Sequence, residues 1–250
     1  MSKSFVQIYE PINTLKEVAK NIWIVDGSIV KMSMYGTQIP FSTRMTIIKL
    51  NNGGLWCHSP IELTPQLKKQ IDLLGEVYHL VSPNKIHYAH INSWAKIYPK
   101  AISWASPGVK ERAAQQNIIV NFNRDLKEIA PIEWATEIEQ LIFKGSRFME
   151  EVVFFHRESK SLILADLIEN FEPHKLNFLS KTLTSLAGSL DPDGKAPLDL
   201  RMTFFGNKKQ AYQCFKKMIE LHPEKIILAH GRWYEKNGTA ELKRAFRWLK

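Results

Sequence analysis

Short apolar runs that end abruptly in a residue able to bind a metal are the clearest pattern in this sequence. The three runs are Val77–Ser82, Leu162–Ala165 and Ile226–Ala229. The residues that follow them, at once or within one short loop, are His87, Asp166 and His230. Apolar runs bounded by turn residues are typical of buried strands, and such strands deliver the next residue to the edge of a sheet. We therefore expect these three residues, distant in the chain, to meet in space.

The pattern also predicts two β-hairpins. Met45–Leu50 and Leu55–His58 flank the turn Asn51–Gly54, and Asn-Gly between two β-rich runs is the strongest short-range hairpin signal. Val152–His156 is joined to the run that begins at Ser161 by a polar turn, which predicts the second hairpin.

Helices and further strands follow the hairpins. Thr64-Pro65 offers an N-cap and a first-turn proline for a helix that ends at Gly75. The other expected helices are Asn92–Tyr98, Lys110–Gln116, Ala211–Leu221 and Glu241–Leu249, and the other expected strands are Asn21–Val25, Ala101–Ala105 and Ile138–Phe143. Residues 31–44 are predicted to form a loop, and residues 117–140, where Glu133, Trp134 and Ile138 fit strand or helix, are left unassigned. Helical stretches broken at Gly188 and by a loop over residues 191–197 are expected between 168 and 209.

These elements indicate an α/β (α+β) protein. Strands alternating with helices favour parallel crossovers and a covered sheet. We predict two packed mixed β-sheets with helices outside, in a single domain over residues 1–250, a length that supports one substantial core.

Composition narrows the class of protein. No apolar run approaches the roughly 20 residues that a membrane span needs, and the first residues lack an apolar signal core. Cys57 and Cys214 are the only cysteines, which excludes a close-spaced cysteine motif and favours a reducing, cytoplasmic setting. The net charge of +9 raises the alternative of nucleic-acid binding, but the basic residues are scattered along the chain.

A set of motifs in this order resembles the metallo-β-lactamase fold superfamily, and within it a bacterial branch known only as a domain of unknown function. The motifs that carry the resemblance are Met45–Leu50, Gly53–Pro60, Ser82–His87, Trp94 with Tyr98-Pro99, Glu151–His156, Leu162–Leu167 and Ala229–Gly231. The resemblance covers roughly residues 20–235. It implies an αββα sandwich of two mixed sheets flanked by helices.

The resemblance also implies a reduced set of metal ligands. The superfamily places His-x-His-x-Asp-His after a strand, but here Pro83 and Lys85 stand at the first two histidine positions, His87 at the aspartate and Tyr88 at the last histidine. Gly145-Ser146 replaces a later Gly-His, so that ligand is Ser146 or absent. The matches that survive are the bridging aspartate, at Asp166, and the last histidine, at His230.

A hydrolase with one metal ion follows from the surviving set. His87, Asp166 and His230 offer nitrogen and oxygen donors suited to zinc, manganese or iron, with His58, ranked above His90, as a fourth ligand or a supporting residue. Such an ion lowers the pKa of water to about 7, and the hydroxide attacks an ester, amide or phosphate. Asp166 and His87 are the candidate catalytic residues. Tyr88 and Trp233 are the candidate substrate contacts, and the substrate itself is an unspecified small molecule.

Structural explanations stand beside these functional ones. Asp166 could cap the segment after it, and His230 could be a hydrogen-bonded turn residue. Glu150 and Glu151 lie roughly opposite Asp166 across the second hairpin, so one of them is a candidate base or is simply solvated, whereas His156 lies at the far end. The alternative function is a non-catalytic protein that carries no metal and binds a small anion, a protein or a nucleic acid.

Overall fold

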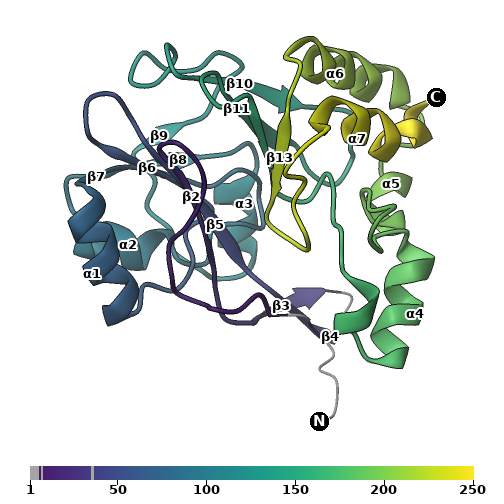
Figure 1. The fold of residues 1–250 in the computed structure, drawn as a ribbon, viewed down its shortest axis with the longest axis horizontal. Coiled ribbons are helices and arrows are strands. Elements are labelled where there is room, and N and C mark those ends of the chain that lie inside the picture. Colours follow the sequence, from purple (N-terminus) through teal and green to yellow (C-terminus); the bar gives the residue numbers. More distant parts are fainter. Residues whose placement is uncertain (1–5, 7, 35–36) are drawn as a thin grey trace.

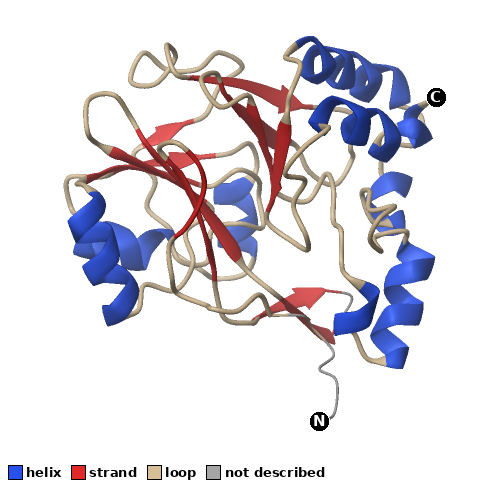
Figure 2. Cartoon of the chain, in the orientation of Figure 1, coloured by secondary structure: helices blue, strands red, loops and turns tan. Residues whose placement is uncertain are grey.

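Two β-sheets pack face to face between two groups of helices (Figures 1 and 2). The computed structural model describes residues 6, 8–34 and 37–250. The larger sheet has the order β1-β2-β5-β6-β7-β8-β9, the smaller sheet β10-β11-β12-β13, and β3-β4 form a separate two-stranded ribbon. The predicted αββα sandwich of mixed sheets is confirmed.

The strands of the larger sheet are β1 (Lys16–Ala19), β2 (Ile22–Asp26), β5 (Arg44–Lys49), β6 (Leu55–His58), β7 (Val77–Val81), β8 (Ile102–Ala105) and β9 (Arg124–Asp125). Those of the smaller sheet are β10 (Ile138–Phe143), β11 (Glu151–His156), β12 (Ser161–Leu164) and β13 (Lys225–Leu228). The helices are α1 (Pro65–Leu74), α2 (Ile91–Ile97), α3 (Val109–Gln115), α4 (Phe178–Ala187), α5 (Leu198–Met202), α6 (Lys208–Glu220) and α7 (Gly238–Ala245), with short 3₁₀ turns at Pro173–Lys175 and Arg247–Leu249.

Three apolar layers hold the sandwich together. One lies between the larger sheet and α1–α3, and another between the smaller sheet and the helices α5–α7. The third lies between the two sheets, where Trp56 of β6 packs edge-on against Phe154 of β11 at a centroid distance of 4.8 Å. The strands therefore bury both faces, which explains why they read as continuous apolar runs instead of alternating ones.

Where the sequence contains the Asn-Gly turn and the Thr64 cap, the strands and the helix begin and end close to the predicted residues. β5 and β6 pair antiparallel through the Asn-Gly turn, and Gly53 adopts φ +85°, the left-handed conformation that glycine favours. The Thr64 hydroxyl accepts a hydrogen bond from the backbone N–H of Leu67, so α1 begins where the cap predicted. Both predicted hairpins are confirmed.

The loop predicted over residues 31–44 is wrong in most of its length. Residues Val30–Met34 and Thr37–Phe41 form the antiparallel strands β3 and β4, and Arg44 already belongs to β5. Gly36 lies outside the described residues. Pro40 misled the prediction, because proline is compatible with a strand in a two-stranded ribbon, where each strand is an edge. The unassigned segment 117–140 contributes β9, a series of turns and the start of β10.

The sheet topology brings the predicted ligands to one place. β12 and β13 are parallel neighbours, with Leu164 opposite Leu228, so the chain leaves both strands at the same edge toward Asp166 and His230. β7 runs parallel to β6, and its last residue, Val81, lies beside His58. None of the helices in the described part of the chain combines the length and apolar character needed to cross a bilayer.

Candidate metal centre

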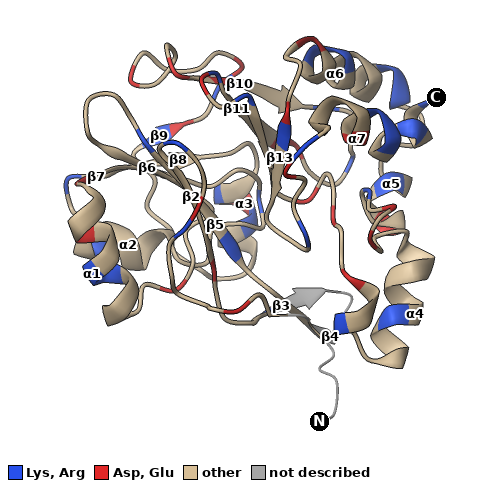
Figure 3. Cartoon of the chain, viewed as in Figure 1, with Lys and Arg blue, Asp and Glu red and all other residues tan. Residues whose placement is uncertain are grey.

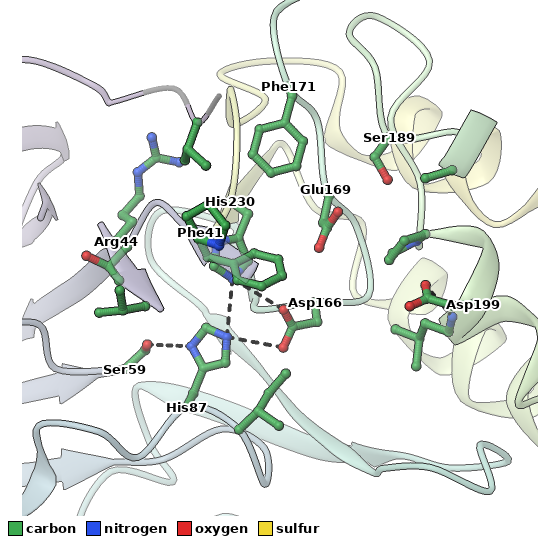
Figure 4. A pocket seen from close by; sticks show the side chains of 18 of the residues that line it. Phe41, Arg44, Ser59, His87, Asp166, Glu169, Phe171, Ser189, Asp199 and His230 are labelled. Carbon is green, nitrogen blue, oxygen red and sulfur yellow. Dashed lines mark hydrogen bonds and ion pairs between the residues drawn. The ribbon is translucent and has the colours of Figure 1, made fainter. Parts of the chain in front are cut away.

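His87, Asp166 and His230 form a tight cluster at this edge (Figure 4). Asp166 Oδ2 lies 3.1 Å from His87 Nε2, and Asp166 Oδ1 lies 3.3 Å from His230 Nε2. The two Nε2 atoms are 3.4 Å apart. Each side chain is less than 10% exposed. Among the described residues this is the one group of three His, Cys, Asp or Glu side chains whose ligand atoms all lie within 4.8 Å of one another. The predicted convergence is confirmed; the chemical roles stay predictions.

Asp166 is held in place by its neighbour on β11. Glu151, 1% exposed, accepts hydrogen bonds from the backbone N–H groups of Ala165 and Asp166, each at 2.8 Å. The prediction that Glu151 lies opposite Asp166 is confirmed, and its solvated alternative is wrong. The carboxylate of Glu151 therefore fixes the backbone on which the Asp166 side chain is carried.

Asn84, which the sequence analysis passed over, links the two carboxylates. Its amide Nδ2 donates to Asp166 Oδ2 at 2.6 Å and to Glu151 Oε2 at 3.1 Å, and its Oδ1 accepts from the N–H of Ile86. The side chain is fully buried. Its only signal in the sequence was its place in the loop after β7, next to positions that the resemblance had already singled out.

Both imidazoles are oriented through the ring nitrogen that faces away from Asp166. His230 Nδ1 lies 2.8 Å from the carbonyl oxygen of Ser42, and because a carbonyl only accepts, Nδ1 carries a proton. His87 Nδ1 lies 2.7 Å from the hydroxyl of Ser59. Ser59 has φ +53°, in the left-handed region that a serine rarely adopts, which brings its side chain under His87. Both Nε2 atoms are thereby directed at the same carboxylate.

The charges of the cluster favour an ionised Asp166. Burial by itself raises the pKa of this carboxyl, but the adjacent His87 and His230 outweigh burial and hold the pKa well below its ordinary value. Burial, together with the charge of Asp166, raises the pKa of Glu151 to about 7, although its N–H donors act against the rise. The negative charge is therefore concentrated on the carboxylate that faces the two imidazoles.

Arg44, the first residue of β5, ties the two sheets together beneath His230. Its Nε donates to Asp26 Oδ1 at 2.7 Å, and its Nη1 donates to the carbonyl oxygens of Leu228 and Gly231 at 2.8 and 2.7 Å. Gly231 has φ +86°, and a Cβ there would lie 2.2 Å from the carbonyl oxygen of Asn170. The sequence analysis missed Arg44, whose one signal was a charge at the start of an apolar run.

The remaining candidates lie outside the cluster. His58 is buried between Trp56 and Phe154, with ring centroids at 5.7 and 5.6 Å, and burial lowers its pKa to about 3. Its Nε2 has no hydrogen-bond partner among the described residues. The fourth-ligand role predicted for His58 stays a prediction. His90 lines the cavity described below without joining the cluster of His87, Asp166 and His230.

The two predicted substrate contacts, Tyr88 and Trp233, do not line that cavity. Tyr88 is 6% exposed, donates to Gln116 Oε1 at 2.5 Å and packs in the core beneath α2. Trp233 is half-buried against the cores on both faces of the smaller sheet. Ser146, named as a replacement ligand, bonds Thr203 and two backbone N–H groups. Their functional roles therefore stay predictions without support from their positions.

A large cavity opens above the cluster. Its volume is about 1220 Å³, and His87, Asp166 and His230 line it together with Glu169 and Phe41 (Figure 4). Burial raises the pKa of Glu169 to about 7. Because the cluster sits in the cavity wall and is itself nearly inaccessible elsewhere, a bound molecule reaches the three side chains from this side.

Solved structures with a similar fold include metallo-β-lactamases and an oxidoreductase. The structure of DIM-1 metallo-β-lactamase exposed to ceftazidime is 13% identical, with a TM-score of 0.63 over 97% of this chain and 98% of that one. The mono-zinc form of metallo-β-lactamase FIM-1 from Pseudomonas aeruginosa is 13% identical, with a TM-score of 0.61 over 94% of each chain. Rubredoxin oxygen:oxidoreductase from Desulfovibrio gigas is 9% identical, with a TM-score of 0.63 over 94% of this chain and 61% of that one.

Sequence comparison gives the family. No curated protein matches the chain. The family model described as "Domain of unknown function (DUF4336)" matches residues 20–190, well over half of the 250 residues. Its range includes His87 and Asp166 but ends before His230. The chain therefore belongs to the DUF4336 family, and it has the metallo-β-lactamase fold.

Proposed function

We propose that this protein is a metal-dependent hydrolase that uses one divalent cation held by His87, Asp166 and His230. The observation that carries the proposal is the pair of imidazole Nε2 atoms, 3.4 Å apart, directed at one buried carboxylate. In His230 the proton sits on Nδ1, because that atom bonds the carbonyl oxygen of Ser42. The lone pair of a neutral His230 therefore points at Asp166.

Such an arrangement needs positive charge at its centre. A lone pair facing a carboxylate oxygen at 3.3 Å is repulsive unless a proton or a cation lies between them. A metal ion satisfies all three ligand atoms at once, and metal-binding histidines commonly donate their other ring N–H to a carbonyl group. The hydrogen bond from His230 to Ser42 is that second bond.

The donor set fits a single ion. Two imidazole nitrogens and one carboxylate oxygen suit zinc, manganese or iron, and three protein ligands are typical of catalytic zinc. No second group of three such ligands occurs among the described residues. The fold relative FIM-1 is described in a mono-zinc form, which supports the view that one ion suffices in this fold. When bound, the ion would polarise a substrate carbonyl or phosphoryl oxygen and lower the pKa of water.

The protein's own groups would orient the reaction. Asn84 fixes one oxygen of Asp166 by a hydrogen bond of 2.6 Å, so that the carboxylate is held toward both imidazoles. The Ser59 hydroxyl fixes the ring of His87. Each of the three side chains is less than 10% exposed, so that these charges act in a medium of low polarity.

The charge distribution gives the nucleic-acid alternative little support. Lys and Arg are spread over many elements and interleaved with acidic residues (Figure 3). Several pair with them, as Lys20 does with Glu158 and Lys110 with Asp125. Cys57 and Cys214 are buried and unpaired, which agrees with the cytoplasmic setting that we propose.

Metal content tests the proposal. We expect purified protein, loaded with zinc, manganese or iron(II) and then desalted, to retain about one equivalent of metal by mass spectrometry, and to hydrolyse members of a panel of esters, lactams and phosphodiesters. His230→Ala should lose both, since it removes one of three ligands. His174→Ala is the matched control, because the His174 side chain is 71% exposed and is not part of the cluster. Absence of retained metal from the wild-type protein would overturn the proposal, as would equal retention in His230→Ala.

A further inference from the structure

The cavity is larger than the catalytic cluster requires. Its volume of about 1220 Å³ exceeds the roughly 300–1000 Å³ of pockets that enclose drug-sized ligands. The three ligand side chains occupy only a part of its wall. Apolar residues of α4 and α5 form one part of the remaining wall and Arg112 of α3 forms another, which indicates a substrate with two unlike ends.

The apolar side is formed by α4, α5 and the chain that follows β12. Its main residues are Phe171, Leu176, Leu183, Ala187, Leu198 and Leu200. Leu200 and Leu176 are buried, whereas Leu183 and Leu198 are 50% and 45% exposed and so mark the mouth. A continuous apolar surface that runs from the interior to the mouth suits a flexible hydrocarbon chain more than a compact polar molecule.

The basic side is formed by α3. Arg112 lines the cavity, is half-buried, and forms no ion pair with the described residues. His90 and Gln116 also line the cavity. In Figure 1, α3 and α4 lie well apart, on either side of the loops that carry Asp166 and His230. A half-buried guanidinium without a carboxylate partner is suited to bind an anionic group of a ligand.

We infer that the substrate is an anionic acyl ester: its hydrocarbon chain lies along Leu183, Leu198 and Leu200, its ester group faces His87, Asp166 and His230, and its anionic group lies against Arg112. This inference rests on the proposed function for the reaction, but the binding it describes needs no metal. In the reaction, the bond between the acyl carbon and the ester oxygen breaks. Water supplies the oxygen that bonds to the carbon and the proton that goes to the released alcohol, and no atom changes its oxidation state.

Binding of non-hydrolysable amphiphiles tests the inference. We would displace an anthroyloxy-labelled stearate from the protein with monoalkyl phosphates of six to fourteen carbons, below their micelle concentrations and in the presence of EDTA. Affinity should rise about four-fold for each methylene that becomes buried, the factor that corresponds to about 0.8 kcal/mol. An affinity that does not change with chain length would overturn the inference.

Two variants test where the hydrocarbon chain of the ligand binds. Leu183→Asn should weaken the binding of dodecyl phosphate about five-fold, because it places a polar amide in the mouth of the cavity. Leu179→Asn is the matched control on the same helix, since Leu179 is 60% exposed and does not line the cavity, and it should bind as the wild type does. Equal effects of the two substitutions would overturn this placement of the chain.

A third variant locates the anionic group. Arg112→Gln should weaken the binding of dodecyl phosphate about ten-fold and leave the binding of dodecanol unchanged, because only the phosphate loses a charge-assisted hydrogen bond. Equal losses for both ligands would contradict a charge contact at Arg112.

The outcomes separate this inference from the proposed function. If the affinity for alkyl phosphates depends on chain length in a protein that retains no metal, the result would support the amphiphile site and contradict the proposed hydrolase. Hydrolysis of short esters without any preference for chain length would support the proposed hydrolase and contradict an amphiphilic substrate. Repeating the displacement with Asp166→Ala tests the two hypotheses separately. That substitution removes a proposed metal ligand but leaves the residues of α3 and α4 unchanged.

Discussion

The floor of the cavity, formed by His87, Asp166 and His230, differs from the wall formed by α4 and α5 in burial and in hydrogen bonding. On the floor, His87, Asp166 and His230 are almost completely buried, and each is held by a second hydrogen-bonded residue. Along the wall, apolar side chains such as Leu183 and Met202 are 50% and 68% exposed and make no directional contacts. Buried polar groups are costly to leave unpaired, whereas exposed apolar groups contribute little to stability. Substitutions on the floor should therefore cost stability and metal affinity, and those on the wall should cost neither.

Among the polar residues that support the floor, the largest effect on stability is expected from Glu151→Ala. The substitution leaves the N–H groups of Ala165 and Asp166 buried without an acceptor, and each such group costs about 1–3 kcal/mol. We expect the free energy of unfolding, measured by urea denaturation, to fall by about 3–4 kcal/mol. Glu150→Ala, one position away and only half-buried, is the control and should change it by less than about 0.5 kcal/mol. Similar values for the two variants would show that Glu151 does not support the floor.

Arg44→Met should have the next largest effect. It removes the buried ion pair with Asp26 and two hydrogen bonds to the carbonyl groups around His230. Asp26 keeps Lys16 at 2.9 Å, so we expect a loss of about 2–3 kcal/mol, at or below the lower limit of the range of about 3–5 kcal/mol for broken buried pairs.

A double-mutant cycle sharpens this expectation. Asp26→Asn combined with Arg44→Met should cost less than the sum of the single substitutions, by about 1 kcal/mol or more. Arg157→Met, which removes a half-exposed ion pair with Glu139, is the control and should cost less than about 1 kcal/mol. Additive single effects at Asp26 and Arg44 would mean that the pair is not coupled.

The sequence predicted the parts of this molecule whose signals are local. The Asn-Gly turn between β5 and β6 and the Thr64 cap of α1 act within a few residues, so their elements were found almost to the residue. Asp166 and His230 could be predicted to converge, because the polar residues that end buried strands gather at sheet edges. The resemblance to a known superfamily added the two-sheet arrangement, which periodicity alone does not give.

The support of the site could not be predicted in the same way. Asn84, Arg44 and Ser42 act through contacts with residues 82, 184 and 188 positions away, and no local pattern encodes such pairs. The ribbon β3–β4 was missed because Pro40 and Gly36 are ordinary loop signals, and its pairing depends on a partner strand that the pattern did not reveal. Tyr88 was predicted to contact substrate because it follows His87 in the chain. Its side chain instead packs in the core between the larger sheet and α1–α3.

A smaller effect, on metal affinity instead of folding, is expected from Asn84→Ala. Asn84 contacts Asp166 without being a candidate ligand, and loss of a residue that orients a ligand commonly weakens metal binding about 10–100-fold. Calorimetric titration of the metal-free protein with zinc would measure the change, with His174→Ala as the control. An unchanged affinity would mean that Asp166 needs no support beyond its backbone.

The smallest effect is expected on the outer face of α4, behind the residues that line the cavity. Leu186→Ser, on α4, replaces a side chain that is 71% exposed and does not line the cavity, so the free energy of unfolding should change by less than about 0.5 kcal/mol. Leu242→Ala on α7, where the leucine is fully buried, should cost about 2–5 kcal/mol under the same conditions. A loss above about 1 kcal/mol for Leu186→Ser would mean that the outer face of α4 is covered in solution. In that case α4 would also be stabilised by packing against another surface, and the contrast between a rigid polar floor and an uncovered apolar wall would not hold.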